Sequence, residues 1–90
     1  MQVVLTIVGK DQVGITAKVA NALAGMNMNI ININQNIMQG FFNMVLIADM
    51  SKANVTLAQA RENMENLGKE MCLDVRLQSE DIFTAMHRIC

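Results

Sequence analysis

The chain has 90 residues, which is enough for one domain with one hydrophobic core. Just over half of the residues (52%) are apolar, whereas a disordered chain combines low hydrophobicity with high net charge. Seven basic and eight acidic residues give a formal net charge of −1, which offers no electrostatic footprint for nucleic acid or for an anionic membrane surface.

Cysteine usage and hydrophobicity set the expected compartment. The two cysteines, Cys72 and Cys90, are far apart in sequence and make up neither a metal-ligand cluster nor a disulfide scaffold. The lack of a disulfide framework favours a reducing compartment. No stretch approaches the roughly 18 apolar residues of a membrane span, and the segment after Met1 lacks the basic start of a signal peptide. We therefore expect a cytoplasmic protein whose partner is neither a membrane nor a nucleic acid.

The first part of the chain predicts a strand followed by a helix. Residues 2–8 are rich in Val, Leu and Ile, and these apolar residues occupy both sets of alternate positions. Such a pattern is typical of a strand inside a sheet that is covered on both faces. The glycines of residues 9–14 break this pattern. A helix is predicted to begin near Asp11 or Val13, with Asp11 as its N-cap, and to end near Gly25, because apolar residues recur there at helical spacing.

The middle of the chain predicts two strands joined by a tight turn. Residues 29–38 alternate isoleucine with asparagine, which indicates a strand with one solvent-exposed face. Gln39-Gly40 can turn the chain, and residues 41–50 then form a strand that is mostly apolar on both faces. The polar face of the first of these strands is either a solvated edge or a set of contacts to a ligand or partner, and it carries Asn32, Asn34 and Asn36.

The last part predicts a helix, a strand and a short terminal helix. Residues 55–71 carry a narrow apolar stripe at steps of three and four, as in a helix packed on a sheet. Residues 72–78 alternate between apolar and polar, which predicts the fourth strand. Residues 80–90 are predicted to form a short C-terminal helix, because Ser79 and the two acidic residues after it are typical of a helix start.

The order of these elements is βαββαβ, the ferredoxin-like arrangement of the α+β class. It predicts a four-stranded antiparallel sheet in the order 4-1-3-2 with both helices on one face. The strands over residues 2–8 and 41–50 then occupy the centre, which fits their apolar character on both faces. Residues 1–90 are predicted to form a single domain, of which about residues 80–90 are a helical extension.

The sheet face opposite the helices is predicted to be apolar. A patch of roughly a few hundred Å² usually marks an interface, so we predict a homodimer or a higher homo-oligomer. The patch would be formed by Val4, Val8, Val45 and Ile47. The alternative is that the chain's own tail covers it with an apolar stripe formed by Ile82, Phe83, Met86 and Ile89.

Residues 9–14 are the candidate binding loop. Free N–H groups at a helix start can bind a carboxylate or a phosphate, and Gly14 would let a ligand approach the backbone closely. The residues alone leave a second interpretation open, in which Asp11 only caps the helix and the glycines only permit the turn.

Longer stretches of the sequence resemble ACT domains. The loop Gly9-Lys10-Asp11-Gln12-Val13-Gly14-Ile15 is followed by an amphipathic helix and by Asn29-Ile30, which is similar to the loop and second strand of that family. The run from Val8 to Val19 and the ending from Glu80 to Ile89 resemble a family of stand-alone bacterial ACT proteins of unassigned function. The chain is also similar to the ACT modules of glycine-cleavage repressor proteins.

The resemblance implies a function and a site. ACT domains typically bind small-molecule ligands, often amino acids, at an interface between domains. Val13 stands where many members have proline, and Gly9 stands where some serine-binding members have histidine. The ligand contacts that the resemblance implies are Asp11, Gln12, Val13, Gly14 and Ile15, with Asn29 as a side-chain partner.

These features favour a regulatory ligand-binding module over an enzyme. Acylphosphatases share the fold but hold phosphate with an arginine in this loop, where the present chain has Lys10. A metal carrier would need a CxxC motif there, and RNA binding on a sheet needs exposed aromatic residues and positive charge. No catalytic residue, metal ligand or cofactor is predicted, and His87 is expected at a surface or an interface. The alternative function is a protein-interaction or dimerisation subunit that needs no ligand.

Overall fold

The computed structural model describes residues 1–79 and confirms the βαββαβ order. The predicted C-terminal helix over residues 80–90 lies outside the described residues, as do His87 and Cys90. In chain order the elements are β1 (Gln2–Lys10), α1 (Ile15–Gly25), β2 (Asn29–Met38), β3 (Phe41–Asp49), α2 (Leu57–Met71) and β4 (Asp74–Ser79).

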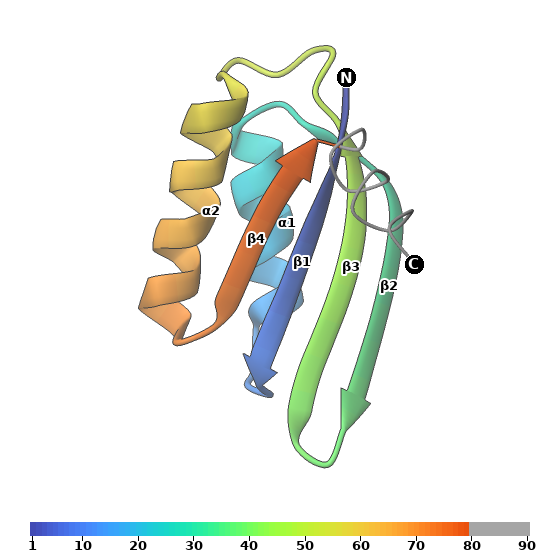
Figure 1. Cartoon of the computed structure of the whole chain (residues 1–90), viewed down its shortest axis with the longest axis vertical. Helices are drawn as coiled ribbons and strands as arrows, with labels where there is room; N and C mark the ends of the chain where they lie inside the picture. The colour runs from blue at the N-terminus through green and yellow to red at the C-terminus, as the bar shows by residue number, and fades with distance from the viewer. Residues whose placement is uncertain (80–90) are drawn as a thin grey trace, which may run out of the picture.

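The four strands form one antiparallel sheet in the order β2-β3-β1-β4, which confirms the predicted order 4-1-3-2. Both helices lie on the same face of this sheet (Figure 1). Val4 pairs with Ile47 and Thr6 pairs with Val45, while the alternate residues of β1 point into the core. The predicted members of the patch therefore lie on the face opposite the helices, where Val8 and Val45 are exposed but Val4 is buried.

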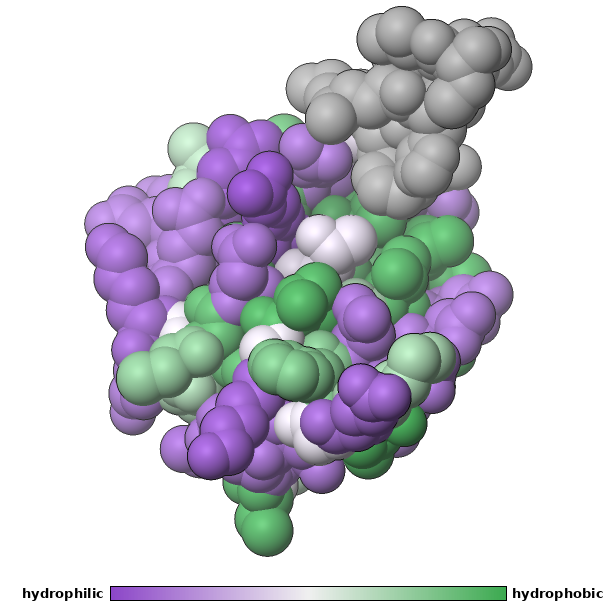
Figure 2. All heavy atoms as spheres, turned by 60° about the horizontal axis from the view of Figure 1, so that its bottom comes forward, coloured by the Kyte–Doolittle hydropathy of each residue, from purple (hydrophilic) through white to green (hydrophobic). Residues whose placement is uncertain are grey.

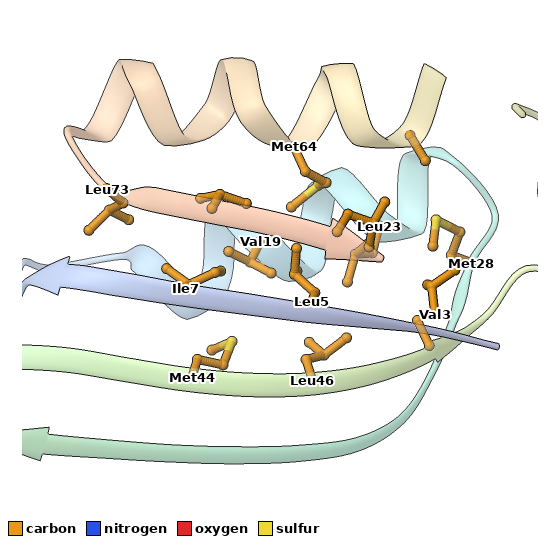
Figure 3. Packing of buried hydrophobic residues seen from close by; sticks show 14 of the residues in the cluster. Val3, Leu5, Ile7, Val19, Leu23, Met28, Met44, Leu46, Met64 and Leu73 are labelled. Carbon is orange, nitrogen blue, oxygen red and sulfur yellow. The ribbon is translucent and has the colours of Figure 1, made fainter. Parts of the chain in front are cut away.

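The hydrophobic core fills the space between the sheet and the two helices. Figure 3 shows side chains of β1 and β3, among them Leu5 and Leu46, pointing toward Leu23 of α1 and Met64 of α2. Burying one such side chain contributes about 1.5–3 kcal/mol. No polar side chain is buried among residues 1–79, so the core contains no group that needs a compensating hydrogen bond.

A capping box sets the start of α2. The Gln59 backbone N–H donates to Thr56 Oγ1 (3.2 Å), and the Thr56 backbone N–H donates to Gln59 Oε1 (3.0 Å). The helix therefore begins at Leu57, two residues later than the sequence predicts. It ends at Met71, before Cys72 adopts a left-handed conformation with a φ of 58°.

The connection from α2 to β4 requires a close approach of backbone to side chain at Gly68. A Cβ atom on Gly68 would lie 2.7 Å from Val75 Cγ2 and 2.9 Å from the Leu73 carbonyl oxygen. The Leu73 backbone N–H also donates to the Gly68 carbonyl (2.8 Å). Helix α2 and strand β4 are thus held against each other without room for a larger residue.

Strand β2 differs from the prediction that only one of its faces is exposed to solvent. Its asparagines lie opposite Ile47, Val45 and Asn43 on the open face of the sheet, as predicted. Its isoleucines are also exposed, however: Ile31 by 49%, Ile33 by 40% and Ile37 by 55%. Two causes are visible: the pairing with β3 shifts register between Ile30 and Asn32, and β2 is the strand farthest from α2 (Figure 1).

Candidate functional site

The loop between β1 and α1 is anchored on two sides. The Asp11 backbone N–H donates to the Gly40 carbonyl (2.8 Å), which ties the loop to the turn between β2 and β3. The Gln12 side-chain amide Nε2 donates to the Met71 carbonyl (2.8 Å) at the end of α2. The loop therefore has a fixed position at the end of the sheet that carries Gly40.

The start of α1 has no side-chain cap. Gly14 is the N-cap residue, with a φ of 89°, so the predicted capping by Asp11 is wrong. The reason is that the left-handed turn at Gly14 delays the helix until Ile15, which leaves Asp11 four residues before the first helical residue. The first helical hydrogen bond runs from the Lys18 N–H to the Gly14 carbonyl (3.0 Å), so the preceding N–H groups have no partner within the helix.

The backbone at Gly14 can be approached closely. A Cβ atom on Gly14 would meet no heavy atom within 4 Å, and the side chain of Val13 is fully exposed. Because the helix dipole adds partial positive charge to free N–H groups, this position suits a carboxylate. Exposed Asp11 is the acidic side chain of the loop, and its carboxylate could bind a positively charged group of the same ligand.

The predicted loop residues differ in what they can offer to a ligand. Ile15 is only 2% exposed and packs in the core, so only its backbone N–H can take part. The amide group of Gln12 is engaged with Met71. The available groups are therefore the carboxylate of Asp11, the side chain of Val13 and the backbone at Gly14 and Ile15.

Asn29 lies at the other end of the sheet. It is the first residue of β2 and pairs with Asp49, whereas the loop adjoins Gly40 between β2 and β3. A strand of this length spans about 30 Å at roughly 3.3 Å per residue. Within one copy of the chain, the structure thus brings Asp11, Gln12, Val13, Gly14 and Ile15 together but does not bring Asn29 to them.

Asn29 instead borders a polar hollow of about 550 Å³. Asp49 is the acidic residue of this hollow, and its carboxylate accepts hydrogen bonds from the Ser51 hydroxyl (2.7 Å) and the Ser51 backbone N–H (3.1 Å). These two bonds hold the pKa of Asp49 below its ordinary value, so the carboxylate is ionised at neutral pH. The lining consists of Ala24, Asn27, Met28, Asn29, Asp49, Ser51 and Lys52.

The hollow is formed by two stretches that lie far apart in the sequence, so no local pattern predicts it. Its residues come from the end of α1 and its connection to β2, and from the end of β3 and the segment after it, which only the fold brings together. The Asp49-Met50-Ser51 spacing was the one local signal, because an aspartate often accepts hydrogen bonds from the residue two positions later.

Residues 1–79 offer neither a metal-binding cluster nor a membrane-spanning helix. That part of the chain holds no group of three or more His, Cys, Asp or Glu residues that could bind a metal ion. It also holds no helix with the length and hydrophobicity needed to cross a membrane.

The chain belongs to the ACT domain family, whose model matches residues 1–78. ACT domains are typically regulatory modules that bind small ligands. The chain is 42% identical over 86 residues to a UPF0237 protein of Methanosarcina acetivorans, covering 96% of this chain and 94% of that protein.

Solved structures agree with this assignment. An ACT domain protein from Streptococcus pneumoniae superimposes with a TM-score of 0.81 at 30% identity, over 92% of this chain and 93% of that one. A putative glycine cleavage system transcriptional repressor superimposes with a TM-score of 0.73 at 23% identity, over 86% of this chain and 44% of that one, and this match supports the fold alone.

Proposed function

We propose that this protein is a non-catalytic regulatory module that binds an amino acid between two copies of the chain. The observation that carries the proposal is the uncapped start of α1 in an ACT domain, where the backbone at Gly14 is open and Asp11 is exposed. The N–H groups would bind the carboxylate of an amino acid, and the carboxylate of Asp11 would bind its ammonium group. Val13 would contact the ligand's side chain.

A second copy would complete this site through Asn29. Strand β2 is an edge strand whose outer side has no neighbouring strand in the sheet order β2-β3-β1-β4. If two copies pair antiparallel along β2, the Asn29 end of one strand meets the Met38 end of the other. Met38 pairs with Phe41, which in turn pairs with Lys10 beside the loop. The amide of Asn29 can both donate and accept, which suits a zwitterionic ligand.

The composition of β2 supports a second copy as its neighbour. Residues 29–38 contain no proline and no charged residue, and these are the features that natural proteins use to block an exposed strand edge. An antiparallel pair is compatible with a two-fold axis, so both copies would use the same surface and form two equivalent sites.

An interaction subunit that binds no ligand is the second candidate. It is supported by apolar side chains on the open face of the sheet, where Val8 is 45% exposed and Val45 is 43% exposed. Figure 2, which views the molecule with the Gly40 end turned forward, shows such apolar surface between polar groups. This candidate needs no amino acid, so a ligand screen separates the two.

The test is a thermal-shift screen of the full chain against the common amino acids. A ligand present at 100 times its dissociation constant stabilises the fold by about 2.7 kcal/mol, which is a shift of several degrees for a small domain. Asp11→Asn should remove the shift, whereas Glu62→Gln, an exposed carboxylate on α2, should leave it unchanged. Absence of any shift in the wild-type chain would leave the interaction subunit as the function.

A further inference from the structure

The hollow beside Asn29 has the charges of a binding site. It contains one carboxylate, that of Asp49, and one ammonium group, that of Lys52, together with the amides of Asn27 and Asn29. Its volume of about 550 Å³ lies within the range of roughly 300–1,000 Å³ of small-molecule sites. We propose that this hollow is a separate site for a small zwitterion, in which Asp49 binds an ammonium group and Lys52 and Asn29 bind a carboxylate.

The two charges are close but not paired with each other. The side chains of Asp49 and Lys52 both line the hollow. No ion pair shorter than 4.0 Å joins them within the described part of the chain. A ligand that carries both charges could therefore bridge them.

The carboxylate of Asp49 retains capacity for a ligand. A carboxylate has about four lone-pair positions, and the two hydrogen bonds from Ser51 use two of them. Those bonds also fix the orientation of the group. The ammonium group of Met1 lies 3.9 Å from Asp49 Oδ1, longer than a hydrogen bond, so an ammonium ion already approaches this oxygen.

The walls of the hollow are held in place before any ligand binds. Asn27 Nδ2 donates to the Lys52 carbonyl (2.7 Å), and this bond joins the end of α1 to the segment after β3. Asn54 strengthens the same junction, because its backbone N–H donates to the Met26 carbonyl (3.1 Å) and its side chain donates to the Gly25 carbonyl (3.3 Å). Preorganised polar groups lose less conformational entropy on binding than mobile ones.

This inference rests on the ligand class of the proposed function and shares Asn29 with it, but its charged residues are different. Asp49 and Lys52 lie at the opposite end of the sheet from Asp11, and the hollow is formed within a single copy of the chain. Substitutions of Asp11 on one side and of Asp49 or Lys52 on the other therefore distinguish the two proposals.

The experiment is an NMR titration of the isotope-labelled full chain with the common amino acids, each added singly. At least one should produce saturable shift changes in residues 24–29 and 49–52. Acetate and methylammonium, which each carry one of the two charges, should bind about tenfold or more weakly than that amino acid. Asp49→Asn and Lys52→Gln should each weaken binding by about tenfold to a hundredfold.

Asp11→Asn is the matched control, because it removes a carboxylate from the other end of the sheet and should leave these changes intact. Shift changes confined to residues 11–17 would overturn the hollow as a site while supporting the proposed function. Binding that survives both Asp49→Asn and Lys52→Gln would also overturn the hollow as a site. Changes confined to the hollow would support this inference and remove the loop site instead.

Discussion

The two edges of the sheet are built in opposite ways. Strand β4 is six residues long and carries charges at Asp74 and Arg76, whose side chains lie 3.7 Å apart. A third charged side chain covers its outer side, because Arg61 Nε donates to the Leu77 carbonyl (3.0 Å). Strand β2 has ten residues and none of these features. A side-chain hydrogen bond joins β2 to α1: the Thr16 hydroxyl donates to Gln35 Oε1 (3.1 Å).

The comparison indicates which edge can accept another strand. A charged, short edge with a satisfied carbonyl resists pairing, whereas a long, uncharged edge exposes backbone donors and acceptors that another strand can use. A lone edge of the β2 type would be an aggregation hazard in a stable protein. The difference between the edges therefore supports a second copy of the chain on β2 and no partner strand on β4.

The largest expected effect comes from placing a charge in the middle of β2. In an antiparallel pair centred on this strand, Asn34→Lys brings two ammonium groups close to the two-fold axis. Since like charges across an interface are strongly unfavourable, we expect the dimer to weaken by about a hundredfold in analytical ultracentrifugation. Asp74→Lys on β4 is the control and should leave dimerisation unchanged; equal effects of both substitutions would contradict the comparison.

A second substitution tests the tight junction that positions β4. Gly68→Ala places a Cβ atom 2.7 Å from Val75 Cγ2, so either α2 or β4 must shift. Overpacking of this kind costs about 1–3 kcal/mol of unfolding free energy, measured by denaturant titration. Gly25→Ala is the matched control, because a Cβ there meets nothing within 4 Å and alanine favours the helix. A neutral Gly68→Ala variant would show that α2 and β4 are less constrained than described.

A third substitution tests the hydrogen bond from Arg61 to strand β4. Arg61→Ala deletes the donor to the Leu77 carbonyl, and we expect a loss of about 1–2 kcal/mol in unfolding free energy. Arg76→Ala is the control, since its ion pair with Asp74 is exposed and contributes at most about 1 kcal/mol. If Arg76→Ala costs more than Arg61→Ala, the ion pair and not the hydrogen bond maintains this edge.

The smallest effect concerns the carboxylate of Asp49, which ends β3 and pairs with Asn29 at the start of β2. Ser51→Ala removes the hydroxyl that lowers the pKa of Asp49, so the pKa should rise toward its ordinary value of 3.8. Because the folded state lowers this pKa, its stabilising contribution is present above pH 3.8 and is lost as the pH falls through the lowered value. An NMR titration of the Asp49 carboxyl carbon measures the change; an unaltered pKa would mean that the hydroxyl bond is not formed.

The sequence predicted the fold well because its periodic signals are local. The bounds of β2 were predicted without error, and the central position of β1 and β3 followed from their apolar residues on both faces. The start of α1 was placed too early, since Asp11 is a favourable cap by residue type. Only the left-handed backbone at Gly14 reveals that the helix starts after it.

The sites were less accessible to sequence reasoning. The alternation in β2 indicates which side chains share a face, but it does not show how far the helices extend over the edge strand, so the exposure of Ile33 and Ile37 was missed. Asn29 and Asp11 belong to one motif pattern along the chain, yet they lie at opposite ends of the sheet. The hollow at Asp49 and Lys52 depends on tertiary contacts with α1, which no local pattern encodes.

The most direct test of the account is hydrogen exchange of the backbone amides of β2 and β4 at several protein concentrations. If two copies pair along β2, the outward amides of this strand should be protected at high concentration and should exchange faster on dilution, while those of β4 should not change. An amino acid that binds between the copies should extend the protection of β2 to lower protein concentration. Exchange of β2 that is fast and independent of concentration, with and without amino acids, would contradict the shared site.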